Sequence, residues 1–210
     1  MKYKYIIWDW NGTIMDDVHV ALDAVNVMLD QWNRPRISME EYRRAMDTPI
    51  LRFYEEFFDM KETSFEWIAK EFNGYYKEHQ KEISLHSGVE ELLKSFQEKN
   101  ICQVVLSCSS QEIIQEYAKS YGIESYFQDI LGADDLLAGS KIERAINYFQ
   151  QKQIPLNQAV LIGDAVHDYE VAKELGIDCI LLACGHQDMA SLEKCGCPVY
   201  EDIQRSPFGK

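Results

Sequence analysis

Apolar and polar positions divide the chain into two kinds of segment. At the amino end and over the carboxyl-terminal half, short apolar runs alternate with stretches of helical period. Such alternation is typical of a parallel sheet with helices on both faces. We predict strands at residues 5–8, 101–106, 130–131, 159–162 and 179–182, and helices at 89–99, 110–121, 167–175 and from 141 onward.

Residues 16–83 follow a different pattern. Apolar side chains recur every three or four positions between Val18 and Leu29, as they do on one face of a helix. Further helices are predicted at 39–46, 50–58 and 64–81, and the stretch is rich in large aromatic side chains. These aromatics can fill a helical core, line a substrate pocket, or do both, because a small helical unit needs bulky residues to bury enough surface.

The two patterns together predict the fold. We expect an α/β protein whose core is a Rossmann-like, doubly wound parallel sheet formed by residues 1–15 and 84–210. An α-helical cap domain, residues 16–83, is inserted into this core. Hydrophobic residues make up 46% of the chain, which is enough to fill a core of this kind.

Charge and hydropathy narrow the function classes. The formal net charge of −14 argues against a nucleic-acid partner, because a phosphate backbone requires a basic face. It leaves room for a small anionic substrate, since one lysine and a metal ion create a local positive site. There is no apolar run of about 18 residues and no signal segment at the amino end, so we expect a cytoplasmic protein without a membrane partner. We further expect either a monomer or a weak dimer.

Six cysteines raise the question of a disulfide or a metal site. Several lie in or beside apolar runs, where a free cysteine packs as a small hydrophobic residue. Cys195-Gly196-Cys197 is a C-x-C pattern, which differs from the C-x2-C of common zinc sites. Cys184, His186, Cys195 and Cys197 could in principle converge on a metal, although their spacing fits no standard ligand pattern.

Polar residues follow the predicted strands. Asp9 ends the first apolar run, Ser107 follows the run at 101–106, and Asp164 follows the run at 159–162. Lys141 begins a predicted helix and Asp168 stands in the first turn of another. Open parallel sheets bind their ligands at the carboxyl ends of the strands, so these side chains are expected to meet at one edge. Taken singly, each is more often a turn, capping or surface residue.

As a set, these residues resemble the motifs of the haloacid dehalogenase superfamily of phosphohydrolases. Its first motif, D-x-D-G-T, is matched by residues 9–13 with Asn11 in place of the second Asp, and its fourth, G-D-x-x-x-D, by residues 163–168. Ser107 and Lys141 match the second and third motifs. The resemblance covers nearly the whole chain. The helical insert is similar to the small cap of phosphoglycolate-phosphatase-like members.

The resemblance implies a magnesium-dependent phosphohydrolase. Asp9, Asp164 and Asp168 would hold Mg²⁺, together with the main-chain carbonyl of Asn11. The cation would offset the repulsion between the Asp9 carboxylate and a phosphate dianion. The substrate class is a small phosphorylated metabolite.

Further residues are implied around the phosphate. Asp9 would attack phosphorus and form an aspartyl-phosphate that water later cleaves. Lys141 would neutralise a second phosphate charge. Ser107, Cys108 and Thr13 would bind the phosphate oxygens, Ser107 through its hydroxyl and Cys108 through its main-chain amide near a helix start.

Asn11 is a departure from the motif with chemical consequences. In family phosphatases the second Asp protonates the leaving oxygen and later activates water, and an amide can do neither. Three readings stay open: a leaving group that needs no proton, such as an acyl phosphate; a proton from His19 or His167; or a catalytically weak phosphate-metabolite-binding protein. Asn11→Asp is expected to accelerate hydrolysis of alkyl phosphates, because it restores a proton donor.

Two other activities also tolerate a non-acidic residue at position 11. Phosphonate hydrolysis uses a cap lysine for imine formation, for which Lys61 and Lys70 are available. Haloacid dehalogenation works without a metal, and the acidic pattern at 163–168 argues against it. Substrate selection is expected from residues 33–53, whose arginines could meet a second anionic group: Arg34, Arg36, Arg43, Arg44 and Arg52.

Overall fold

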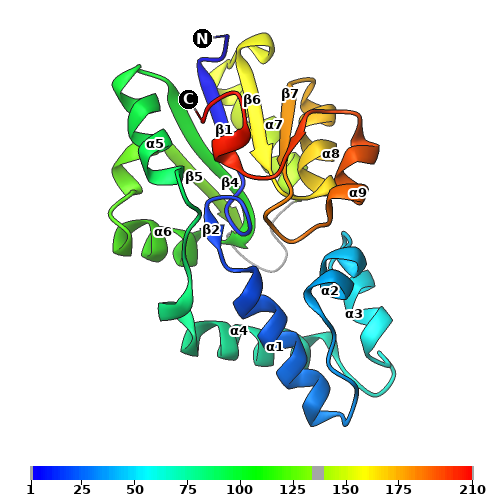
Figure 1. Ribbon diagram of the computed structural model, residues 1–210. Coiled ribbons are helices and arrows are strands. Elements are labelled where there is room, and N and C mark those ends of the chain that lie inside the picture. Colours follow the sequence, from blue (N-terminus) through cyan, green and yellow to red (C-terminus); the bar gives the residue numbers. More distant parts are fainter. Residues whose placement is uncertain (1, 134–139, 210) are drawn as a thin grey trace.

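The computed structural model describes residues 2–133 and 140–209 and has a six-stranded parallel sheet at its centre (Figure 1). The strand order is β5-β4-β1-β6-β7-β8, so the first strand lies in the middle. The predicted α/β, doubly wound fold is confirmed. The strands of this sheet are β1 (Tyr5–Trp8), β4 (Cys102–Ser110), β5 (Asp129–Ala133), β6 (Ala159–Gly163), β7 (Asp178–Leu182) and β8 (Val199–Tyr200).

Helices cover both faces of the sheet because its buried strands are apolar on both sides. Ile6 and Trp8 face one hydrophobic cluster, which α5 and α6 complete, and Ile7 faces a second, which α7 and α8 complete. All three side chains are almost fully buried. The helices of this part are α5 (Val89–Glu98), α6 (Gln111–Ser120), α7 (Lys141–Lys152), α8 (Val166–Leu175) and α9 (Met189–Leu192).

The helices between the first strand and α5 gather beyond the carboxyl ends of the strands (Figure 1). They have their own hydrophobic cluster, to which the predicted face of α1 contributes Val18, Val25 and Leu29. The chain leaves the sheet region through β2 (Met15–Asp16) and returns through β3 (Ser84–Leu85), and these two strands pair antiparallel. The helices are α1 (Val18–Gln31), α2 (Met39–Ala45), α3 (Leu51–Phe57) and α4 (Phe65–Glu78).

The structure differs from the predicted elements where segments are very short or irregular. β2, β3 and β8 have two residues each, too few to show a periodicity. β4 was expected to end before Ser107, yet it continues to Ser110 after a register shift against β5. Single 3₁₀ turns complete the chain: η1 (Gln80–Glu82), η2 (Glu124–Tyr126), η3 (Leu156–Gln158), η4 (Glu193–Cys195) and η5 (Ile203–Arg205). Within the described residues, no helix is both long and apolar enough for a membrane span.

Candidate active site

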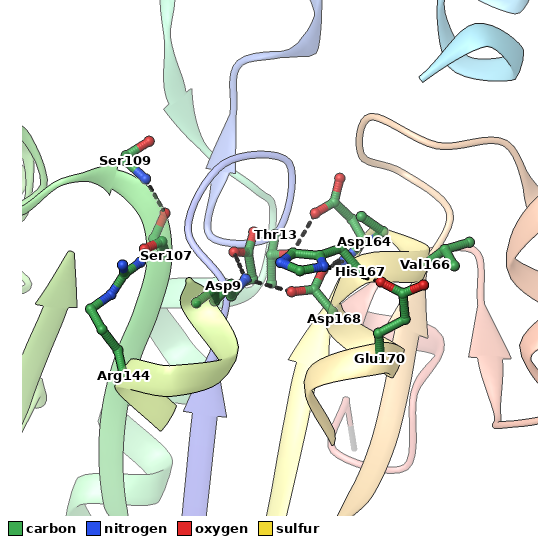
Figure 2. Close-up of polar contacts among 12 residues, drawn as sticks. Asp9, Thr13, Ser107, Ser109, Arg144, Asp164, Val166, His167, Asp168 and Glu170 are labelled. Atoms are coloured by element: carbon green, nitrogen blue, oxygen red, sulfur yellow. Dashed lines mark hydrogen bonds and ion pairs between the residues drawn. The ribbon is translucent and has the colours of Figure 1, made fainter. Parts of the chain in front are cut away.

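Three buried aspartates meet at the carboxyl edge of the sheet (Figure 2). Asp9 follows β1 and Asp164 follows β6, and these two strands are neighbours in register. Asp168 lies in the first turn of α8. One carboxylate oxygen from each of the three lies within 4.8 Å of the others. Residues more than 150 positions apart in the sequence therefore form one acidic cluster.

Lys141 connects two of these carboxylates. It is the first residue of α7, whose start is fixed by a capping box between Ser140 and Glu143. Its ammonium donates to Asp9 Oδ1 and to Asp168 Oδ1, both at 2.5 Å, and its side chain is 3% exposed. Burial disfavours this charge, but the carboxylates of Asp168 and Asp9 outweigh burial and raise the pKa of Lys141 above its ordinary value.

The acidic cluster is under-compensated by this one cation. Burial raises the pKa of Asp9 well above its ordinary value, although Lys141 acts in the opposite direction. Burial also raises the pKa of Asp164 to about 6. Lys141 contacts only Asp9 and Asp168, and the His186 side chain near Asp164 is already paired with Asp17, so the cluster keeps an excess of negative charge that a bound cation would neutralise.

Two glycines make room for the Asp164 carboxylate. A Cβ atom would stand 2.3 Å from Asp164 Oδ2 at position 12 and 2.1 Å from the same oxygen at position 185. Gly12 also has a φ of +70°, which favours glycine. The carboxylate accepts hydrogen bonds from Thr13 Oγ1 at 3.1 Å and from the His186 amide at 2.6 Å. Asp164 is thus held firmly at the edge of the sheet.

The predicted phosphate-binding residues on β4 lie beside this cluster. Ser107 is buried, and its hydroxyl oxygen accepts a hydrogen bond from the Ser109 amide at 3.1 Å (Figure 2). Arg144 on α7 donates to the Ser107 carbonyl at 2.6 Å. The Cys108 side chain is exposed. The bulge at this end of β4 therefore keeps the Ser107 side chain inside and turns the Cys108 side chain outward.

Asn11 belongs to a network that sequence reasoning missed. Its Nδ2 donates to Asp17 Oδ2 at 2.7 Å and to the Tyr76 hydroxyl at 3.1 Å, and its Oδ1 accepts from Ser109 Oγ at 2.6 Å. Asp17 is 1% exposed and accepts further hydrogen bonds from the Gly12 amide at 2.8 Å and from Tyr76 at 2.6 Å. The Asn11 side chain is therefore in direct contact with the Asp17 carboxylate.

His186 completes the network from the other side of the site. Its Nε2 lies 3.2 Å from Asp17 Oδ1, and its Nδ1 is hydrogen-bonded with the Tyr42 hydroxyl of α2 at 2.9 Å. Burial opposes both charges, but their pairing prevails: it lowers the pKa of Asp17 to about 2 and raises that of His186 to about 9. Near neutral pH the pair is ionised. No motif marks His186, which the sequence suggested only for a cysteine-rich metal site.

Of the residues considered as substitute proton donors, His167 lies beside the aspartates (Figure 2) and His19 lies away from them. His19 is exposed, and its Nε2 lies 3.2 Å from the Glu82 carbonyl. His167 Nδ1 contacts Glu170 at 3.2 Å (Figure 2). Lys61 and Lys70, considered for imine formation, are both exposed. The observed contacts therefore give none of these four side chains a link to Asn11.

The cysteine-rich metal hypothesis is not supported. Cys184 and His186 lie by Gly12 and Asp164, whereas Cys195 and Cys197 pack against the hydrophobic cluster on one face of the sheet. Among the described residues, the three aspartates are the only group of potential metal ligands this close together. All six cysteines are free thiols.

One of the arginines suggested for substrate selection reaches the sheet side of the molecule. Arg43 of α2 donates to the Cys184 carbonyl at 2.8 Å. Arg34 donates to the Phe57 carbonyl, and Arg36 and Arg52 pair with acidic side chains of the helical segment at Asp30 and Asp47. These three therefore stabilise the helical segment itself.

Comparison with known proteins identifies the family. The family model for haloacid dehalogenase-like hydrolases matches residues 6–182, which is most of the chain. The chain belongs to this family. A phosphoglycolate phosphatase of Pseudomonas syringae pv. tomato is 25% identical over 212 residues, covering 96% of this chain and 78% of the relative.

Solved structures show the same fold for this hydrolase. A haloacid dehalogenase-like family hydrolase from Streptococcus pneumoniae superposes with a TM-score of 0.81 at 21% identity and covers 94% of this chain and 93% of its own. Protein Tyrosine Kinase A from Mycobacterium tuberculosis superposes with a TM-score of 0.77 at 20% identity, covering 97% and 96%. Because proteins with different names share this fold, the chemistry must be argued from the site.

Proposed function

We propose that this hydrolase is a magnesium-dependent phosphatase that cleaves the phosphate ester of a small metabolite, with Asp9 as nucleophile. The observation that carries the proposal is the buried Lys141 ammonium, 2.5 Å from both Asp9 and Asp168, beside Asp164. Three buried carboxylates and one buried ammonium do not contribute to hydrophobic packing, whereas a phosphoryl-transfer site needs a nucleophile, a cation and a metal site. The phosphatase name of the curated relative supports the same class.

The donor set fits Mg²⁺. Asp9, Asp164 and Asp168 offer hard carboxylate oxygens, and we propose that they hold the ion together with the main-chain carbonyl of Asn11. When bound, Mg²⁺ supplies positive charge that screens the nucleophile from the phosphate dianion. The buried Asp168 also has a second task, because its Oδ2 accepts from the Asp164 and Ala165 amides while its Oδ1 holds Lys141.

The remaining residues would bind and orient the phosphate. We assign the Ser107 hydroxyl, the Cys108 amide, Thr13 and Lys141 to the phosphate oxygens. A carboxylate oxygen of Asp9 forms the new bond to phosphorus as the bond from phosphorus to the leaving oxygen breaks, and the leaving oxygen takes its proton from water. Water then cleaves the aspartyl-phosphate, which releases inorganic phosphate and restores Asp9. Residues 16–83 are proposed to act as a cap domain that closes over this edge, with its boundaries at the β2–β3 pair.

The environment of Asn11 favours a second candidate function, hydrolysis of acyl phosphates. Both protons of the Asn11 amide are used by Asp17 and Tyr76, and Asp17 is ionised because its pKa lies near 2. Neither side chain can protonate a leaving oxygen, and an acyl phosphate releases a carboxylate that needs no proton. We expect kcat/KM for acetyl phosphate to exceed that for glycerol phosphate by at least about 10²-fold, the typical contribution of a positioned acid.

A phosphate-release assay tests the proposal. The purified protein is incubated with alkyl, aryl and acyl phosphates in Mg²⁺ and, in parallel, in EDTA. Release that depends on Mg²⁺ is expected for at least one class. If phosphate compounds raise the melting temperature and none is hydrolysed, the chain is a phosphate-binding protein and the proposed function is wrong.

Metal binding gives a separate prediction. Asp164→Asn removes one ligand charge, so we expect Mg²⁺ affinity to fall by about 10²-fold or more, since even outer-shell changes cost up to that much. In the wild type, affinity should also decline as the pH falls below about 6, where Asp164 takes up a proton. Calorimetric titration measures both effects. Asp188→Asn, a change at a carboxylate away from the cluster, is the control, and equal affinities in the two variants would refute the assignment.

A further inference from the structure

Asp17 is a buried carboxylate that the proposed chemistry does not use. It occupies the N-cap position of α1, where an aspartate normally accepts hydrogen bonds from the first amides of its helix. Here it makes no such bond. Its carboxylate turns back toward the loop after β1 and accepts from the Gly12 amide and the Asn11 side chain. The position of Asp17 is therefore not explained by helix capping.

The amide at position 11 and the carboxylate at position 17 are matched to each other. The Asn11 amide has two N–H donors, one for Asp17 Oδ2 and one for the Tyr76 hydroxyl, while its oxygen accepts from Ser109. A flipped amide would place its oxygen against a carboxylate. An aspartate at position 11 would place two carboxylates 2.7 Å apart in a partly buried site. The site therefore accommodates one carboxylate, either at position 11 or at position 17, but not one at each.

Asp17 also connects helices α4 and α2 to the loops that carry Asn11 and Asp164. Tyr76 of α4 donates to its Oδ2 at 2.6 Å, and His186 lies 3.2 Å from its Oδ1. His186 in turn contacts Tyr42 of α2 and donates its amide to Asp164. A change at Asp17 therefore reaches Asn11 and Asp164 through one intermediate contact at most.

We propose that Asp17 is a positioning residue for the hydrolysis proposed above, and that it forms with Asn11 a pair in which amide and carboxylate can be exchanged only together. Asp17 fixes the orientation of the Asn11 side chain beside the nucleophile and holds α4 and the His186 loop in place around it. The positioning role of Asp17 rests on the proposed function. The pairing of Asp17 with Asn11 does not, because it is tested by stability alone.

A double-mutant cycle tests the pair. Asn11→Asp, Asp17→Asn and the combined exchange N11D/D17N are compared with the wild type by melting temperature in EDTA. Each single change is expected to lower the melting temperature by about 5–10 °C, because a charged hydrogen bond is lost, and N11D adds repulsion. The exchange restores one amide and one carboxylate, so its loss should be less than half the sum of the single losses. Additive losses would overturn the pairing.

Kinetics test the positioning role. D17N is expected to lower kcat by about 10²-fold with a smaller change in KM, as misplacement of a group beside the reaction can do. In the exchanged variant, the carboxylate at position 11 should raise hydrolysis of alkyl phosphates above the wild-type rate. Asp23→Asn, at an exposed carboxylate on α1, is the matched control.

The outcomes separate the positioning role of Asp17 from its pairing with Asn11. If D17N keeps the wild-type kcat and melts earlier, Asp17 is only a structural anchor and the positioning role is wrong. If no Mg²⁺-dependent hydrolysis exists in the wild type, the proposed function and the catalytic role of Asp17 both fail, while the melting-temperature cycle still decides whether the two residues are paired.

Discussion

Asp9→Asn is expected to lower kcat by about 10³-fold or more, because an amide cannot form the bond to phosphorus that the proposed mechanism requires. The substitution preserves size, and Lys141 keeps its contact with Asp168, so the fold should be retained. The melting temperature of the metal-free protein is expected to stay within about 5 °C of the wild type, since the core packing is unchanged.

Steady-state hydrolysis and thermal melting, made on the same preparations, check this expectation. Asp23→Asn, again at the exposed α1 carboxylate, controls for loss of a negative charge anywhere in the chain. A D9N variant that hydrolyses the substrate at the wild-type rate would show that Asp9 is not the nucleophile. Mass spectrometry of rapidly quenched wild-type protein should find a phosphoryl adduct that D9N lacks.

Lys141→Met is expected to lower the free energy of unfolding of the metal-free protein by about 3–5 kcal/mol. The variant would leave Asp9 and Asp168 buried without the ammonium that both contact at 2.5 Å. Mg²⁺ should recover part of the loss, because it brings positive charge to the same carboxylates. Hydrolysis should fall as well, since the charge that we propose binds the phosphate is lost.

Urea unfolding in EDTA and in Mg²⁺ measures this loss. Lys152→Met is the matched control, because Lys152 pairs with Asp129 on the surface with a side chain that is 43% exposed, and such a pair contributes at most about 1 kcal/mol. Burial raises the pKa of Asp9 above its ordinary value and Lys141 opposes this shift, so without Lys141 the variant should regain stability as the pH falls and Asp9 takes up a proton. If K141M and K152M unfold alike, the buried pair does not have the role assigned to it.

The sheet and the acidic cluster could be predicted because each depends on local signals. The apolar run before Asp9 and the one before Asp164 are clear in the sequence, and parallel strands bring their carboxyl ends to one edge. Lys141 was identified from its place at a helix start. The resemblance to known motifs then assigned roles that composition alone could not.

The network around Asn11 could not be predicted because it depends on long-range packing. Asp17 and His186 are 169 positions apart, and neither belongs to a motif. In the sequence Asp17 only precedes the helical pattern that begins at Val18, and it is the fold that turns its side chain back to Asn11. The expectation for Asn11→Asp changes accordingly: with Asp17 in place, the single substitution adds a like charge, and a gain in rate is expected only when Asp17 is changed as well.

The central position of β1 has a consequence for synthesis of the chain. The strand that carries Asp9 pairs with β4 and β6, whose residues begin at Cys102 and Ala159. On the ribosome this apolar segment emerges before β4 and β6, and it has no partner strand from this sheet until about a hundred further residues have been made. The intervening helices, which have a hydrophobic cluster of their own, can form in the meantime. The strand before Asp9 is thus made before both of its neighbours, and it is enclosed on both sides only once β6 has been made.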